Sequence, residues 1–191
     1  GVESGVVAPA GLDRVYASRR VALLVGIDAY TDPALGDLAF AAKDAADMAE
    51  VLRDPELGDY DVVSLVTGEV SRGTFWDAFE AIASTVQRDD TVVVYVAGHG
   101  TLDLGADGVE LYLLGSDAWL ARGAETGIPV RDLSAAVNSL PSRRTVMVLD
   151  ACYSGTGRSV VAPEVERKLG MLRGPVPAPS ALAVSAFSAH L

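Results

Sequence analysis

Five short apolar segments, most of them separated by helical patterns, constrain the fold of this chain more than any other feature. They lie at residues 21–27 (VALLVGI), 60–66, 91–97 (TVVVYVA), 145–149 and 181–186. Segments of this length, rich in β-branched and aliphatic side chains, are typical of strands that are buried on both faces. Strands that alternate with helices predict an α/β fold with a mostly parallel sheet and helices on both faces.

The segments between these strands carry the helical patterns. We expect residues 38–53 (LAFAAKDAADMAEVLR) and 71–87 to form amphipathic helices, because their apolar side chains recur at helical spacing. A further helix is expected to end at Leu140, just before a proline. Residues 105–108 predict a turn, and residues 109–114 predict a short strand or hairpin arm.

The length of the chain fits one domain with a sizeable core. We assign residues 1–19 to a flexible lead-in and residues 20–191 to the domain, in which residues 155–179, with four prolines, form a mobile loop. Because the chain stops five residues after the fifth strand, we expect a further C-terminal part or a second polypeptide to complete the sheet.

Charge, hydropathy and cysteine content restrict the partners and the location. The net charge of −11 argues against nucleic acid and anionic membranes, and favours cationic ligands such as basic peptides. No apolar segment approaches the length of about 18 residues that a membrane span needs, and the N-terminus does not resemble a signal peptide. A single cysteine excludes an internal disulfide and fits a reducing, cytoplasmic compartment.

Two motifs stand at the ends of apolar segments: residues 96–100 (VAGHG) and residues 150–155 (DACYSG). They place His99 and Cys152, the only cysteine, 53 residues apart in sequence but both at the carboxyl end of a predicted strand. Ligands bind at that edge of an open α/β sheet. A thiol beside an imidazole forms a nucleophile–base pair, whereas a lone buried cysteine is otherwise a small hydrophobic residue. The polar residues around the cysteine favour the reactive interpretation.

With these motifs, residues 21–186 resemble the caspase-like cysteine peptidases of family C14, most closely the metacaspase and prokaryotic branch. The resemblance includes residues 24–27 (LVGI), 43–45 (KDA) and 112–117. It implies a caspase-like three-layer sandwich and an endopeptidase, with a place in a bacterial signalling or defence pathway.

The resemblance also implies roles for particular residues. Cys152 would attack the peptide carbonyl as a thiolate, and His99 would protonate the leaving amine. The main-chain N–H groups of Gly100 and Cys152 would form the oxyanion hole. The metacaspase branch cleaves after Arg or Lys, and Asp44 and Asp150 match the acidic residues of its first specificity pocket. The chain departs from many relatives at Ala97, where they carry a serine.

No cofactor is required by this chemistry. Calcium is the open alternative, because some metacaspases bind it through acidic clusters, and this chain has acidic residues at Asp103, Asp107, Glu110 and Asp117. Their spacing matches no calcium-binding loop, which favours a solvated acidic loop.

Expected partners are a protein or peptide substrate with a basic residue at the cleavage site, and an activating partner. Basic residues within 155–179 suggest that the loop is itself cleaved on activation. One alternative is a catalytically silent caspase-like interaction module. A nucleotide-binding α/β domain is another, but the segment between Gly26 and Gly36 lacks the glycine-rich phosphate loop that it needs.

Overall fold

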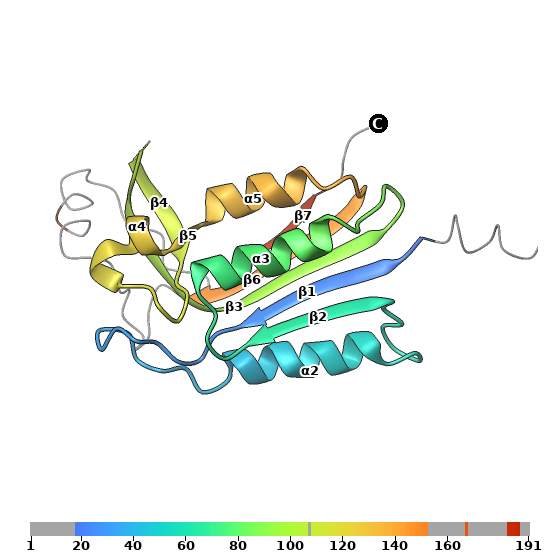
Figure 1. The fold of residues 1–191 in the computed structure, drawn as a ribbon, viewed down its shortest axis with the longest axis horizontal. Helices are drawn as coiled ribbons and strands as arrows, with labels where there is room; N and C mark the ends of the chain where they lie inside the picture. The colour runs from blue at the N-terminus through green and yellow to red at the C-terminus, as the bar shows by residue number, and fades with distance from the viewer. Residues whose placement is uncertain (1–17, 107, 153–166, 168–182, 188–191) are drawn as a thin grey trace, which may run out of the picture.

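The computed structural model describes residues 18–106, 108–152, 167 and 183–187, and within them a seven-stranded sheet is flanked by helices (Figure 1). The strands are β1 (Arg20–Gly26), β2 (Val62–Thr67), β3 (Thr91–Gly105), β4 (Gly108–Leu113), β5 (Ile128–Pro129), β6 (Arg144–Cys152) and β7 (Ala183–Phe187). The helices are α2 (Ala41–Arg53), α3 (Arg72–Ala83), the short α4 (Gly123–Thr126), α5 (Val130–Asn138) and a 3-10 turn, η1 (Leu120–Arg122).

The core of the sheet is parallel, as the sequence predicts. Strands β2, β1, β3 and β6 lie side by side in parallel, and β7 pairs antiparallel with β6 at one edge. Beyond its parallel part, β3 continues into an antiparallel hairpin with β4, which in turn pairs with β5. The predicted α/β fold with a mostly parallel sheet is therefore confirmed.

Helix α2 covers one face of the sheet with small side chains. Ala45 and Ala49 are fully buried and pack with Leu24 of β1. The contact is close at Gly26, where an added Cβ would lie 2.4 Å from the main-chain oxygen of Ala41. Alanine on the helix and glycine on the strand bring the first turn of α2 against the carboxyl end of β1.

Helices α3 and α5 cover the opposite face (Figure 1). Phe75 and Phe79 of α3 and Leu133 and Val137 of α5 join one apolar cluster with Val94 and its neighbours in the strands. Helix α3 begins where expected, since Ser71 caps it by accepting the N–H of Thr74 at 3.0 Å. This face holds the larger part of the core.

Several boundaries differ from the sequence prediction. Helix α2 begins three residues later than expected, and α3 ends at Ala83 rather than residue 87. The largest difference is in β3: the sequence predicts an end at residue 97, but the strand continues to Gly105, because it exchanges its partner β1 for β4. Strand β6 likewise runs through Cys152. His99 and Cys152 themselves therefore lie in strands and not in loops.

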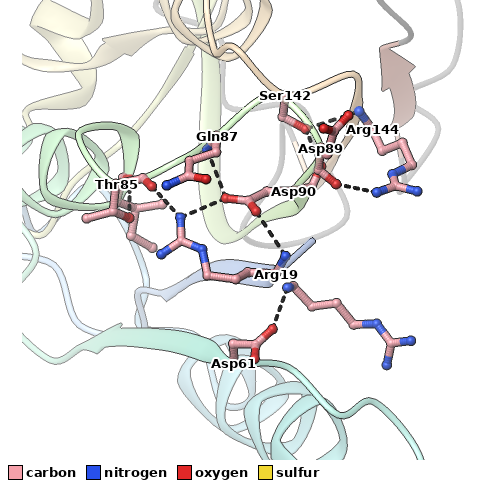
Figure 2. A network of polar contacts seen from close by, with 10 residues as sticks. Arg19, Asp61, Thr85, Gln87, Asp89, Asp90, Ser142 and Arg144 are labelled. Atoms are coloured by element: carbon pink, nitrogen blue, oxygen red, sulfur yellow. Dashed lines mark hydrogen bonds and ion pairs between the residues drawn. The ribbon is translucent and has the colours of Figure 1, made fainter. Parts of the chain in front are cut away.

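The amino end of the sheet is held by a polar network around Asp90 (Figure 2). The main chain and the guanidinium of Arg19 donate hydrogen bonds to its carboxylate at 2.9 and 2.7 Å, and the N–H of Gln87 donates at 2.8 Å. Ser142 donates its hydroxyl to the Asp90 carbonyl at 2.7 Å. The network joins the segments that lead into β1, β3 and β6, at the edge opposite the two motifs.

Two predictions fall largely on residues that the structure does not describe. The predicted lead-in, apart from residues 18 and 19, and the predicted loop over 155–179, apart from residue 167, lie outside the described residues. Among the helices that are described, none is long and apolar enough to cross a membrane.

Candidate active site

Parallel pairing of β3 with β6 brings the two motifs together. In this register Ala97 lies opposite Asp150 and His99 lies opposite Cys152, at the carboxyl end of β6 and of the parallel part of β3. Two residues far apart in sequence thus become neighbours across one strand pair, as expected for the ligand-binding edge of an α/β sheet. The side chain of Cys152 itself lies outside the described part of the structure.

The imidazole of His99 is buried, with 3% of the residue exposed, and one of its nitrogens has a fixed partner. Its Nε2 lies 2.7 Å from the main-chain oxygen of Gly36. Because a carbonyl can only accept a hydrogen bond, Nε2 carries a proton in this contact. The tautomer is thereby selected, and Nδ1 is the nitrogen left to exchange a proton with another group.

Tyr30 supports His99 from the loop that follows β1. Its hydroxyl accepts the main-chain N–H of His99 at 2.8 Å and donates to the Ile27 carbonyl at 3.0 Å. Its ring packs on the imidazole with the centroids 4.7 Å apart. Burial, the largest cause, raises the pKa of Tyr30 far above its ordinary value of 10.0, so the hydroxyl keeps its proton at any physiological pH.

The loop that carries Gly36 is anchored at several points. The N–H of Leu38 donates to the Asp28 carbonyl at 2.8 Å, which closes the loop on itself. The carboxylate of Asp32, 4% exposed, accepts the N–H groups of Ala34 and Leu120 at 2.9 and 2.8 Å. These anchors fix the carbonyl that orients His99.

The sequence prediction missed Tyr30, Gly36 and Asp32, because their roles depend on contacts with β3 and with the segment after β4. Only the Asp32-Pro33 pair carries a local signal, since it is typical of a turn.

Gly100 is the residue where β3 changes partner. It pairs with Leu113 of β4, and next to it the N–H of Leu114 donates to the carbonyl of His99 at 2.9 Å. An added Cβ at Gly100 would lie 3.4 Å from the Tyr112 oxygen, which is a tight contact. The oxyanion-hole role of its N–H stays a prediction.

The two predicted pocket carboxylates act on the same phenol. Asp44 is exposed in the first turn of α2, whereas Asp150 is half-buried and accepts the Tyr95 hydroxyl at 3.3 Å. Burial first, and then the negative charges of Asp150 and Asp44, raise the pKa of Tyr95 to about 12. A residue from each of α2, β3 and β6 therefore contributes to one acidic region on the α2 face of the sheet.

The acidic residues considered for calcium either lie in different segments or already have hydrogen-bond or ion-pair partners. Asp103 and Glu110 are register partners in the β3–β4 hairpin; Asp103 accepts a main-chain N–H of α4 at 2.8 Å, and Glu110 pairs with Arg131 at 2.7 Å. Asp117 lies beyond β4, and Asp107 is outside the described residues. Within the described ranges, no three His, Cys, Asp or Glu residues are grouped so that they could hold a metal ion.

Comparison with known proteins adds independent information. The family model of the caspase domain matches residues 19–187. Among solved structures, protein GSU0716 from Geobacter sulfurreducens superposes with a TM-score of 0.55 at 22% identity, over 81% of this chain and 64% of that chain. The Drosophila initiator caspase Dronc aligns with a TM-score of 0.49 at 14% identity, over 71% of this chain and 58% of that chain. The chain thus spans less than two thirds of either structure. No curated protein matches it in sequence.

Proposed function

The chain belongs to the caspase domain family, and on that premise we propose that it is a cysteine endopeptidase with Cys152 as nucleophile and His99 as its acid–base partner. The single observation that carries the proposal is the β3–β6 register, which sets these two residues opposite each other at the carboxyl edge of the sheet. The Nε2 contact of His99 with Gly36 adds a chemical reason, because it leaves Nδ1 for proton transfer.

The proposed reaction proceeds in two steps. His99 takes the thiol proton, and the Cys152 sulfur attacks the peptide carbonyl; the C–N bond then breaks as the imidazolium protonates the leaving amine. Water, deprotonated by the same imidazole, hydrolyses the thioester and restores the thiol. Main-chain N–H groups of Gly100 and Cys152 would stabilise the oxyanion, and each such donor contributes about 3–4 kcal/mol in well-studied enzymes.

We assign the acidic region at Asp44 and Asp150 to recognition of an Arg or Lys side chain before the scissile bond. Two carboxylates that both raise the pKa of one phenol create a strongly negative region, which attracts a guanidinium or ammonium. An acidic side chain at that position would face like charges and be excluded. The protein substrate would therefore be cleaved after basic residues.

Activation by cleavage within residues 155–179, and a cytoplasmic site of action, belong to the same proposal. Both rest on the sequence: the segment carries basic residues that such an enzyme would accept, and the chain has a single cysteine.

The direct test uses a fluorogenic peptide with Arg before the fluorophore, together with a thiol-reactive inhibitor that carries Arg. The wild-type protein should hydrolyse the peptide and gain one inhibitor adduct by intact mass. Cys152→Ala should gain no adduct and lose turnover, and His99→Ala should lose turnover while it keeps its fold. A folded wild-type protein that neither turns over nor becomes labelled would instead be a silent interaction module.

A further inference from the structure

A polar cavity lies beside Tyr30, the residue that packs on His99, and the proposed mechanism does not use it. Its volume is about 430 Å³, and it is lined by Ala29, Tyr30, Thr31, Glu69, Ser71, Thr74, Ser116 and Asp117. These residues come from the loop after β1, the connection from β2 into α3, and the segment after β4. Three chain segments thus converge on one cavity at the carboxyl edge of the sheet, which is where α/β folds bind ligands.

The cavity carries negative charge and an unused hydroxyl. Glu69 and Asp117 are both exposed, and neither forms an ion pair within the part of the chain that the structure describes. Ser116 is 8% exposed, and its hydroxyl has no hydrogen-bond partner among the described residues. Ser116 lines the cavity, and its hydroxyl oxygen keeps some exposure to solvent. A largely buried hydroxyl with no protein partner can accept a hydrogen bond from a ligand.

The neighbouring helix end does not reverse this charge. The N-terminus of α3 contributes at most about half a positive charge, and Ser71 already caps the N–H of Thr74. The guanidinium of Arg72 donates to the carbonyl of Glu125 and does not line the cavity. Two full carboxylate charges therefore dominate, and the cavity favours a cation.

Tyr30 connects the cavity to the proposed dyad of His99 and Cys152. It lines the cavity, and its ring packs 4.7 Å from the imidazole of His99. The acidic region at Asp44 and Asp150 lies on the face covered by α2, whereas the cavity includes the start of α3, which covers the opposite face. When the basic side chain before the scissile bond lies on the α2 side, the part of the peptide after the bond continues past His99 and Cys152 on the opposite side, next to Tyr30.

We propose that this cavity is a second cation subsite, which binds a Lys or Arg side chain that follows the scissile bond. The inference rests on the proposed peptidase function and extends it: the preferred substrate carries basic residues on both sides of the cleaved bond. The carboxylates of Glu69 and Asp117 would pair with the ammonium or guanidinium, and the Ser116 hydroxyl would accept one of its N–H groups.

The test uses quenched peptides with Arg before the bond and Lys, Ala or Glu at the two positions after it. The wild type should cleave the Lys peptides about two- to fivefold faster in kcat/KM than the Ala peptides, as expected for solvent-accessible ion pairs, and the Glu peptides most slowly. The double variant Glu69→Gln, Asp117→Asn should lose this order. Glu56→Gln, an exposed carboxylate at the opposite edge of the sheet, should keep it.

Two further measurements separate this inference from the proposed function. An Arg–fluorophore substrate has no residue after the bond, so its hydrolysis by the wild type reports the peptidase function alone. An NMR titration of Cys152→Ala protein with a short lysine peptide should shift the amide signals of Thr74 and Ser116, and the same titration of the double variant should not. Equal cleavage of Lys and Glu peptides, or a titration with no shift at these amides, overturns the second subsite.

Discussion

The main-chain N–H of His99 donates to the hydroxyl of Tyr30, which itself donates to the carbonyl of Ile27. Strands β1 and β3 pair as far as Gly26 and Ala97 and then separate. The phenol occupies the gap that opens beyond these residues and replaces the ladder hydrogen bond that is lost there. The backbone of His99 is thereby held by a side chain, next to the point where β3 changes partner.

Tyr30→Phe should remove this bridge and keep the ring that packs on the imidazole. The main-chain N–H of His99 loses its acceptor, so we expect a loss of stability of about 1–2 kcal/mol. We also expect kcat for an Arg peptide to fall about tenfold with KM unchanged. A misplaced imidazole that raises the activation free energy by about 1.4 kcal/mol slows the reaction by that factor. Steady-state kinetics and urea denaturation check both.

Tyr60→Phe is the matched control, since Tyr60 is a half-buried phenol in the connection before β2, at the opposite edge of the sheet. It should leave kcat unchanged. Equal effects of the two substitutions on kcat would contradict the positioning role of Tyr30.

Replacing the pocket carboxylates should weaken the use of basic substrates. Asp150→Asn removes a charge that faces Tyr95, and we expect kcat/KM for Arg peptides to fall about 10- to 100-fold, the range for one charge-assisted hydrogen bond. Asp44→Asn should act in the same direction. Asp47 lies on the same helix as Asp44, and its carboxylate pairs with Lys43, so Asp47→Asn should have little effect. Similar losses for Asp44→Asn and Asp47→Asn would show a general effect of net charge.

Asp90 should make the free energy of unfolding depend on pH in the acidic range. Burial raises the pKa of its carboxyl, but the hydrogen bonds from Arg19 and Gln87 lower it by more, so it lies below the ordinary value of 3.8. A folded-state pKa below the unfolded one stabilises the fold above the unfolded-state pKa, and this contribution is lost as the pH falls through the folded-state pKa.

We therefore expect Asp90→Asn to lower the free energy of unfolding by about 1–3 kcal/mol at pH 7 and by clearly less at pH 3. Urea denaturation at both pH values measures the difference. Asp59→Asn is the control, because Asp59 forms only an exposed ion pair with Arg20 at 3.7 Å. A constant difference between pH 7 and pH 3 would exclude the ionised carboxylate as its source.

Two glycines, one at the end of β1 and one in the loop that follows it, should respond differently to alanine. At Gly26 the new Cβ would lie 2.4 Å from the Ala41 oxygen, so α2 must shift, and we expect a loss of about 1–3 kcal/mol. At Gly36 no heavy atom lies within 4 Å of the new Cβ, so Gly36→Ala should change stability by less than about 0.5 kcal/mol. Thermal unfolding of both variants tests the order, and equal melting temperatures would disprove the close α2–β1 contact.

Much of the fold is encoded locally. Continuous apolar segments such as residues 21–27 and 91–97 predict buried strands, because only a strand with helices on both sides buries every residue of a short run. The alanine-rich pattern of 38–53 predicts the helix that lies closely against β1. The motifs around His99 and Cys152 could be assigned to strand ends for the same reason, and the structure sets them opposite each other.

The sequence alone did not determine the contacts between segments that are far apart in the chain. The extension of β3 to Gly105 depends on the arrival of β4, and the tautomer of His99 depends on the carbonyl of Gly36, whose position is set by a loop. Every residue carries a main-chain carbonyl oxygen, so no sequence pattern indicates which of them contacts His99. Periodicity and composition thus fix which segments become strands and helices, whereas the packing of distant segments decides which atoms meet at the site.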